Sequence, residues 1–142
     1  MNQHNKIILM VEDNPDDAEL AIIALRNSHL ANDIKHVRDG EEALQFLLGQ
    51  PKSPLPHLVL LDLHMPKVGG LEVLKRLRSN PRTRRLPVVI LTSSSEDEDI
   101  ATSYDFGANS YIRKPIDFDQ FSECVKQLGL YWLVMNETPL NR

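Results

Sequence analysis

The sequence predicts an α/β domain whose core is a doubly wound, five-stranded parallel sheet in the order 2-1-3-4-5. Short apolar runs alternate with longer segments of helical periodicity, as in folds built from repeated strand-helix units. The runs IILMV, LVLL and VVIL are continuously apolar, which is typical of central strands covered by helices on both faces. DIKHV and SYIRK contain charged residues, which is typical of edge strands.

Each element is expected from its local pattern. We expect strands at residues 6–11, 33–37, 58–62, 87–92 and 109–113, and helices at 15–28, 41–48, 71–79, 96–106 and from 117 onward. Asn14-Pro15 suits a helix cap followed by proline in the first turn. Ser95 to Glu98 reads as a capping box, and Gly107 stands where a helix end favours a left-handed residue.

Length and composition limit the function. The 142 residues, with 42% hydrophobic and 25% charged, suit one domain with a core at about 6–128 and an extension at 129–142. A net charge of -4 argues against a nucleic-acid partner. We expect the local basic cluster to be a solvated face, and its members are Lys75, Arg76, Arg78, Arg82, Arg84 and Arg85.

The cellular compartment is expected to be the cytoplasm. Cys124 is the single cysteine, so an internal disulfide or a cluster of thiolate metal ligands is excluded. The five apolar residues from Ile7 to Val11 are too few for a signal-peptide core or a membrane span, so no membrane association is expected.

Polar side chains follow four of the expected strands where each strand ends. Glu12 and Asp13 follow the first strand, Asp62 ends the third, and Thr92 and Lys114 end the fourth and fifth. Each residue alone has a plainer explanation, such as a turn, a helix cap or a solvated charge. The carboxyl ends of parallel strands meet at one edge of the sheet, so we expect these side chains to converge there.

These residue types predict phosphoryl transfer. Clustered carboxylates repel one another, and a hard divalent cation such as Mg²⁺ (or Mn²⁺) relieves that repulsion. Asp62, which ends the apolar run LVLLD, is the expected nucleophile and forms an acyl phosphate. The cation, the Thr92 hydroxyl and the Lys114 ammonium are expected to bind one phosphoryl oxygen each.

Five blocks resemble successive motifs of the receiver domain of two-component response regulators, over residues 6 to about 128. The blocks are VEDNPDDAEL, LVLLDLHMP, GLEVLKRLR, LPVVILTSS and GANSYIRKP. The resemblance implies a flavodoxin-like fold and a switch that a sensor histidine kinase phosphorylates, with no small-molecule product to turn over. The stretch QPKSPLPH and the later YWL are similar to the small single-domain regulators that pair with bacterial phytochrome kinases.

The resemblance assigns roles to the acidic residues. Asp62 matches the phosphoacceptor, Asp13 matches a direct metal ligand, and Glu12 matches an acid that acts mainly through water. The backbone carbonyl of His64 would complete the protein ligands. The His64 side chain stands two residues after the nucleophile, where side chains tune the lifetime of the phosphate. The plainer expectation for it is a solvent-facing loop residue.

The resemblance also assigns the switch. Thr92 and Tyr111 match the pair in which the hydroxyl moves to the phosphate and the aromatic ring turns inward behind it. Lys114 matches the lysine of the family, whose bond to the following proline, Pro115 here, is usually cis. Gly69-Gly70 replaces the usual acid-glycine pair, so the helix that follows is expected to lack its side-chain cap.

The chain ends in an unusually apolar segment. Six consecutive apolar residues from Leu130 to Met135 exceed what one helical face can bury. An extended helix with Tyr131, Trp132 and Met135 partly exposed would suit a partner, or a homodimer through the fifth strand and the last two helices. Packing of this segment back onto the domain is the alternative of equal weight.

Three further functions fit the sequence less well. A phosphatase of the haloacid dehalogenase type would need a second acid where His64 stands. A flavin or nucleotide binder would need a glycine-rich loop where EDNPDD stands. A degenerate receiver that acts only as an interaction module is disfavoured because all five chemical positions are filled.

Overall fold

The structure is a computed structural model that describes residues 6–27, 33–49, 54–114 and 117–136. The strands are β1 (Ile7–Val11), β2 (Asp33–Val37), β3 (Leu58–Leu61), β4 (Val88–Thr92) and β5 (Ser110–Arg113). The helices are α1 (Pro15–Asn27), α2 (Gly40–Leu48), α3 (Gly70–Arg78), α4 (Asp97–Asp105) and α5 (Phe118–Leu130), followed by the π-helical turn η1 (Tyr131–Met135). Where residues are described, the bounds of the strands and of α1 to α4, and the start of α5, lie within one residue of those expected.

The strands form one parallel sheet in the order β2-β1-β3-β4-β5, which confirms the predicted topology. β3 and β4 are buried along their whole length, and β1 is buried from Ile8 onward. The two edge strands, β2 and β5, each keep several partly or fully exposed residues. Asp33, Lys35 and Arg113 are exposed, as the sequence predicted, whereas Lys114 at the end of SYIRK is only 10% exposed.

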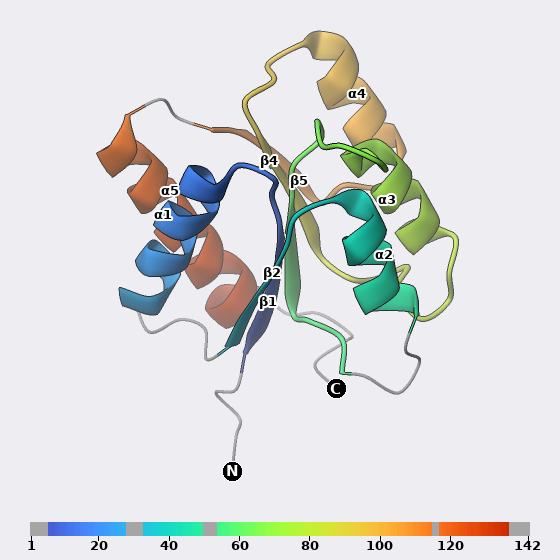
Figure 1. Cartoon of the computed structure of the whole chain (residues 1–142), viewed down its shortest axis with the longest axis horizontal. Helices are drawn as coiled ribbons and strands as arrows, with labels where there is room; N and C mark the ends of the chain where they lie inside the picture. Colours follow the sequence, from blue (N-terminus) through green and yellow to red (C-terminus); the bar gives the residue numbers. More distant parts are fainter. Residues whose placement is uncertain (1–5, 28–32, 50–53, 115–116, 137–142) are drawn as a thin grey trace.

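Helices cover both faces of the sheet (Figure 1). α1 and α5 lie on one face, over the strand residues Ile8, Met10, Leu58, Leu60, Val89 and Leu91. α2 and α3 lie on the other face, over Leu9, Val11, Val59, Leu61, Val88 and Ile90. Alternate residues of each central strand thus fill two separate core layers. α4 is on the same side as α2 and α3, and Ser103 is its single fully buried residue.

The helix ends agree with the sequence in three cases and differ in one. Asn14 Oδ1 accepts hydrogen bonds from the amides of Asp16 and Asp17 at 3.0 and 3.1 Å, which caps α1 as predicted. Gly107 has a φ of 103° after α4, and the Gly69 cap of α3 lacks a side-chain hydrogen bond. The prediction of a capping box at Ser95 is wrong. α4 is capped by Glu96 without a side-chain bond, because the helix begins one residue later than expected.

The basic cluster is only partly the solvated face that we expected. Arg76 Nε pairs with Glu72 on the surface of α3 at 2.9 Å. Arg78 is instead half-buried and donates to the carbonyls of Gly107 and Leu86 at 2.9 and 2.8 Å. Burial lowers the pKa of the Arg78 guanidinium below its ordinary value. Arg78 therefore ties α3 to the loops around β4 and β5.

The C-terminal segment combines both expected arrangements. The extended helix does not stay α-helical, because η1 closes with a bond from the Asn136 amide to the Tyr131 carbonyl at 2.7 Å. Leu133 is buried and Trp132 packs against the core layer under α1 and α5. Tyr131 and Met135 are 49% and 64% exposed, so one side of the turn stays uncovered. Among the described residues, no helix has both the length and the apolar character needed to cross a membrane.

Candidate functional site

The carboxylates of Glu12 and Asp62 are positioned by the sheet itself. The Glu12 amide donates to the Val37 carbonyl at 3.0 Å, and the Asp62 amide donates to the Val11 carbonyl at 3.1 Å. The parallel hydrogen-bond pattern thus continues one residue beyond β1 and β3 and fixes both backbones. Asp62 Oδ1 also accepts a hydrogen bond from the Leu63 amide at 2.8 Å, which orients the carboxylate. Both side chains are buried.

The backbone at the start of α3 packs closely against the loop after Asp62. The Gly70 amide donates to the Leu63 carbonyl at 2.9 Å, so the start of α3 lies directly against this loop. A Cβ atom at Gly70 would collide with the Asp62 carbonyl oxygen. The glycine at position 70 is therefore needed for packing beside the acid, whereas the neighbouring Gly69 has room for a methyl group.

Three carboxylates meet at the edge of the sheet. Glu12, Asp13 and Asp62 can each offer an oxygen, and these oxygens lie within 4.8 Å of one another. Carboxylate oxygens are the ligands that Mg²⁺ and Mn²⁺ accept in proteins, and one exposed acid beside two buried ones leaves room for water and phosphate oxygens. The donor set fits a divalent cation, as the sequence predicted.

Lys114 balances this negative charge. Its Nζ lies 2.7 Å from Glu12 Oε1, 2.9 Å from Asp17 Oδ2 and 3.8 Å from Asp62 Oδ2. The side chain is only 10% exposed. Burial alone would lower the pKa of Lys114, but its hydrogen bonds to Glu12 and Asp17 outweigh burial and raise the pKa above its ordinary value. Lys114 therefore stays charged at the centre of the site.

Glu12 is the acid most affected by burial. Burial raises the pKa of Glu12 to about 7, even though the hydrogen bond from Lys114 acts in the opposite direction. His36 Nε2 lies 2.8 Å from the Glu12 carbonyl oxygen, and the Asn14 amide donates to Glu12 Oε2 at 3.1 Å. The backbone and the side chain of this residue are thus held independently.

Thr92 and Tyr111 are connected through the loop between β4 and α4. Thr92 is completely buried, and its hydroxyl has no hydrogen-bond partner among the described residues. Such a buried hydroxyl is costly unless an acceptor arrives. The Tyr111 hydroxyl donates to the carbonyl of Ser94 at 2.8 Å, two residues after Thr92. The Lys114 amide donates to the Thr92 carbonyl at 2.7 Å, so the ends of β4 and β5 lie together.

The sequence did not predict the roles of Asp17, Ser94 and Asp99 in this site. Asp17 accepts from Lys114. Asp99, near the start of α4, accepts from Ser94 Oγ at 2.6 Å and lies 3.2 Å from His64 Nε2. The hydrogen bond from Ser94, with a smaller contribution from His64, lowers the pKa of Asp99 below its ordinary value. His64 is thus solvent-facing, as expected, but it has a partner.

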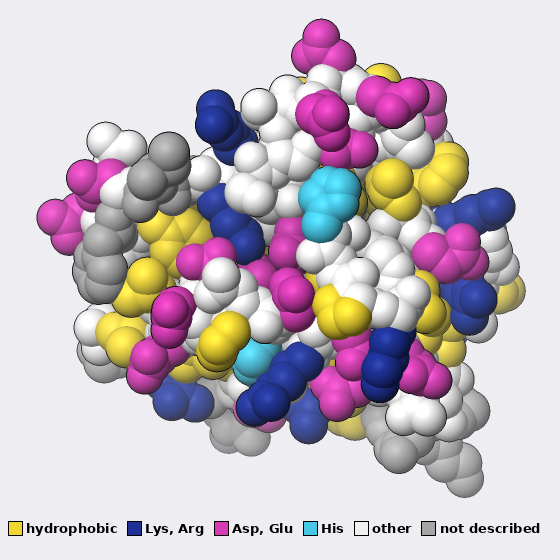
Figure 2. Space-filling model, turned by 45° about the horizontal axis from the view of Figure 1, so that its top comes forward, with side chains coloured by type: hydrophobic (Ala, Val, Ile, Leu, Met, Phe, Trp, Pro, Cys, Tyr) yellow, Lys and Arg dark blue, Asp and Glu magenta, His cyan; other side chains and the backbone are white. Residues whose placement is uncertain are grey.

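The site opens onto a groove of about 570 Å³ on the face that carries the carboxyl ends of the strands. Figure 2 shows acidic side chains gathered on this face, with lysine and arginine side chains beside them. The residues that line the groove are Glu12, Asp13, Asn14, Pro15, Asp17, Asp62, His64, Ser93 and Lys114. The predicted site residues from β1, β3 and β5 therefore share one opening.

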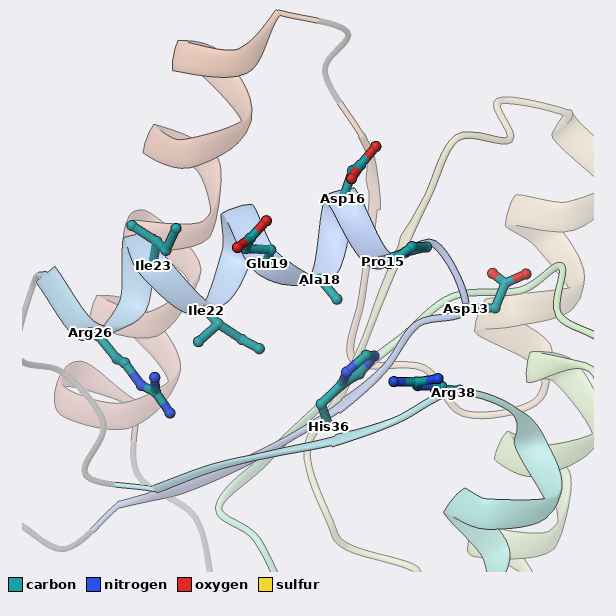
Figure 3. Close-up of a pocket in the computed structure, with 10 residues that line it drawn as sticks. All are labelled: Asp13, Pro15, Asp16, Ala18, Glu19, Ile22, Ile23, Arg26, His36 and Arg38. Atoms are coloured by element: carbon teal, nitrogen blue, oxygen red, sulfur yellow. The ribbon is translucent and has the colours of Figure 1, made fainter.

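A second pocket, of about 510 Å³, lies beside the first, between α1 and β2 (Figure 3). Asp13 belongs to both pockets. Ile22 extends from α1 toward His36 and Arg38 of β2 and its following loop, while Arg26 lies at the far end of the helix. This surface is mixed in charge and partly apolar, unlike the acidic groove beside it.

Two expectations are not tested by these contacts. The bond between Lys114 and Pro115, expected to be cis, lies outside the described residues. The ligand role of the His64 carbonyl stays a prediction.

Tyr131, Trp132 and Met135 lie together at the end of α5, where the rings of Tyr131 and Trp132 meet edge to face at 5.1 Å. These interface candidates lie in η1, which is separate in sequence from the residues that line the groove.

Comparison with known proteins agrees with this geometry. The response regulator receiver domain family matches residues 8–126. A probable methanogenesis regulatory protein, FilR2 of Methanothrix harundinacea, is 41% identical over 136 residues, which cover 94% of this chain and 87% of that protein. The crystal structure of the phosphorylated cyanobacterial phytochrome response regulator RcpA has a TM-score of 0.91 at 39% identity, covering 95% of this chain and 99% of that one. The Mn²⁺-bound form of response regulator Rcp1 has a TM-score of 0.88 at 36% identity, covering 94% and 99%.

Proposed function

The chain belongs to the response regulator receiver domain family, and from that premise we propose that Asp62 is its phosphoacceptor. An Asp62 oxygen would attack the phosphorus of a phosphohistidine on a sensor kinase. The phosphorus-nitrogen bond would break, the kinase imidazole would leave, and an acyl phosphate would form on Asp62. The observation that carries this proposal is the gathering of Glu12, Asp13 and Asp62 within 4.8 Å of one another, beside Lys114.

The other site residues would stabilise the phosphoryl group. A divalent cation held by Glu12, Asp13, Asp62 and the His64 carbonyl would supply positive charge next to the phosphoryl oxygens when bound. Lys114 would neutralise a second oxygen while it stays hydrogen-bonded to Glu12. The Thr92 hydroxyl, which lacks a partner among the described residues, would donate to a third.

The switch would act through the β4–α4 loop. When the Thr92 hydroxyl donates to a phosphoryl oxygen, the loop that contains Ser94 would shift with it. Tyr111 donates to the Ser94 carbonyl, so the ring of Tyr111 would follow this movement. The result would be a changed binding surface over α4 and β5 and no released small-molecule product, so we propose a switch rather than an enzyme.

We propose that the kinase docks over α1 beside the site. A phosphohistidine must come within bonding distance of Asp62, so the surface next to the groove must contact its carrier. The pocket between α1 and β2 shares Asp13 with the site, and Ile23 on the same helix is 48% exposed.

RcpA is described as a phytochrome response regulator, so a phytochrome kinase is the proposed partner. The lone Cys124 suits the reducing cytoplasm as the location.

We also propose a homodimer through α4, β5 and α5 together with η1. Tyr131, Val134 and Met135 of η1 are 49%, 61% and 64% exposed. Tyr104 of α4 is 51% exposed. Aromatic and methionine side chains of this kind are enriched in interfaces between protein subunits. The Met135→Glu variant should weaken the dimer in sedimentation experiments.

Each surface provides the control for the other. Ile23→Glu should reduce phosphotransfer from a purified phytochrome kinase, while phosphorylation by acetyl phosphate and the sedimentation of the protein stay unchanged. Met135→Glu should leave phosphotransfer unchanged and alter sedimentation. If Ile23→Glu lowered both phosphorylation reactions equally, the variant would damage the site itself, and the proposed docking surface would be wrong.

Intact mass after incubation with acetyl phosphate tests the phosphorylation itself. Wild-type protein should gain one phosphoryl group in the presence of Mg²⁺ and none after the cation is chelated. Asp62→Asn should gain none under either condition, although it keeps the size of the side chain. Phosphorylation of Asp62→Asn to the same extent as wild type would exclude Asp62 as the acceptor.

A further inference from the structure

The turn between β1 and α1 is tied to the edge strand β2 on both sides of Glu12. The Glu12 amide donates to the Val37 carbonyl at 3.0 Å, and the Glu12 carbonyl oxygen lies 2.8 Å from His36 Nε2. A carbonyl oxygen can only accept a hydrogen bond, so the imidazole carries a hydrogen on Nε2 and donates it. β2 ends at Val37, and the His36 side chain supplies a donor beyond the end of the strand.

The bond from His36 affects the residue that follows Glu12. The Glu12 carbonyl and the Asp13 amide belong to one planar peptide unit, so a fixed Glu12 oxygen fixes the direction in which the chain enters Asp13. The Asp13 side chain is exposed, and among the described residues none forms a hydrogen bond or an ion pair with its carboxylate. The position of this carboxylate therefore depends on the backbone on either side of it.

The other two acids of the carboxylate cluster have direct hydrogen bonds to their side chains. Asp62 Oδ1 accepts from the Leu63 amide at 2.8 Å. Glu12 Oε2 accepts from the Asn14 amide at 3.1 Å. Asp13 is thus the member of the cluster that relies most on how its backbone is held.

His36 lies in the pocket between α1 and β2 (Figure 3). Its ring extends from β2 toward the turn that carries Asp13 and Pro15, which line the same pocket. Ile34, two residues earlier in β2, shares this face of the strand and packs against the core layer under α1 and α5. The strand therefore directs the half-buried imidazole to the turn.

We propose that His36 is a positioning residue for the divalent cation, because its bond to the Glu12 carbonyl holds Asp13 where it completes the carboxylate cluster. This inference rests on the proposed role of Asp13 as a metal ligand. Mg²⁺ requires nearly ideal octahedral geometry with short bonds to oxygen, so a small displacement of one carboxylate weakens its binding. Ca²⁺ accepts longer bonds and irregular geometry, so the same displacement affects it less.

Titration calorimetry of the unphosphorylated protein with Mg²⁺ and with Ca²⁺ tests the proposal. His36→Leu removes the donor, and its affinity for Mg²⁺ should fall by roughly 3- to 10-fold. This is less than the loss of about 10- to 100-fold that is typical when a residue bonded directly to a metal ligand's side chain is replaced. The affinity of His36→Leu for Ca²⁺ should fall by a smaller factor than its affinity for Mg²⁺.

Two further variants separate the hydrogen bond from a general loss of structure. His36→Gln keeps a side-chain N–H group and should restore the affinity for Mg²⁺ to within about twofold of wild type. Lys35→Leu is the matched control on the same strand, because the Lys35 ammonium lies over the Phe46 ring, 5.8 Å from its centroid, on the opposite face of β2. Lys35→Leu should bind both cations like wild type. Urea unfolding in the presence of a chelator shows that each variant is folded before the cation is added.

Wild-type affinity for Mg²⁺ in His36→Leu would overturn the inference, as would equal losses for Mg²⁺ and Ca²⁺ or equal losses in His36→Leu and His36→Gln. Asp13→Asn separates this failure from that of the proposed function. If Asp13→Asn bound Mg²⁺ weakly while His36→Leu bound it normally, the inference alone would be wrong. If Asp13→Asn bound Mg²⁺ as wild type does, the proposed ligand role of Asp13 would be wrong as well.

Discussion

The ammonium of Lys114 lies 3.8 Å from Asp62 Oδ2, farther than from Glu12 and Asp17, with which it makes hydrogen bonds of 2.7 and 2.9 Å. Lys114 is thus held beside the proposed phosphoacceptor without a direct hydrogen bond to it. The positive charge of Lys114 thus lies near the Asp62 oxygen at a distance longer than a hydrogen bond. Two neighbouring acids therefore hold the lysine in place beside the proposed phosphoacceptor.

Replacing Lys114 with methionine should destabilise the protein and reduce its phosphorylation. Glu12 would stay buried without its partner, which we expect to cost about 2 to 3 kcal/mol of unfolding free energy, reduced by protonation of the acid. Urea unfolding measures the loss. Lys126→Met, which breaks the exposed pair with Glu123, should cost about 0.5 kcal/mol or less. Equal losses in both variants would contradict the central position of Lys114.

Replacing Asp13 with asparagine should weaken binding of Mg²⁺. The variant removes one negative charge from the carboxylate cluster, and we expect the affinity to fall by about tenfold or more. Isothermal titration calorimetry of the unphosphorylated protein gives the affinity directly. Asp16→Asn is the matched control, because Asp16 is exposed in the same segment but lies outside the cluster. An equal loss in both variants would show a general charge effect rather than a metal ligand.

The two glycines before α3 should respond differently to alanine. A Cβ at Gly70 collides with the Asp62 carbonyl oxygen, so Gly70→Ala should cost about 2 kcal/mol or more and disturb the proposed phosphorylation site. At Gly69 the nearest atom is 3.4 Å from the added Cβ, which is ordinary contact. Gly69→Ala should therefore keep wild-type stability within about 0.5 kcal/mol. Chemical unfolding of both variants decides the matter, and equal stabilities would refute the close approach.

The stability of the fold should fall in mild acid, partly because of His57. Its Nδ1 accepts a hydrogen bond from the Ile7 amide at 3.1 Å, which protonation would break. Burial, with the charge of Lys6, lowers the pKa of His57 below its ordinary 6.5. The unfolded chain therefore binds this proton more readily, so the stability from His57 is present above pH 6.5 and lost as the pH falls below it.

His57→Asn tests this assignment, because asparagine keeps an acceptor but does not titrate. The variant should lose less unfolding free energy than wild type between about pH 7.5 and about pH 5.5. An NMR titration of the wild-type ring should give a midpoint below 6.5. Identical pH dependence of the two proteins, or a midpoint above 6.5, would contradict the role of the Ile7 contact.

The sheet and its carboxylates could be predicted because the evidence for them is local. The buried strands are continuously apolar, and the chain places Glu12 and Asp62 directly after two of them. Asp17 was missed although a signal existed. Ala21 and Leu25, four and eight residues later, are buried, so the helical period turns Asp17 toward the domain. An acid on the inner face of a helix needs a partner, which here is Lys114.

The contact between His64 and Asp99 and the π turn η1 had no such signal. Asp99 is one of four consecutive acids, and the sequence does not distinguish which of them reaches His64, 35 residues away. The capping box predicted from Ser95 to Glu98 is absent because α4 begins one residue later than expected, with Glu96 as its cap. In η1, the pattern of apolar residues could not separate an α-helix from the wider π turn, which depends on how Leu133 and Trp132 pack.

Chemical identification of the phosphorylated residue tests the account most directly. Borohydride reduces an acyl phosphate on aspartate to homoserine, which peptide mapping then locates in the chain. Protein treated with acetyl phosphate and Mg²⁺ should contain homoserine at position 62 and retain aspartate at positions 13 and 17. Homoserine at another acid, or none in protein that has gained a phosphoryl group, would contradict the assignment of Asp62.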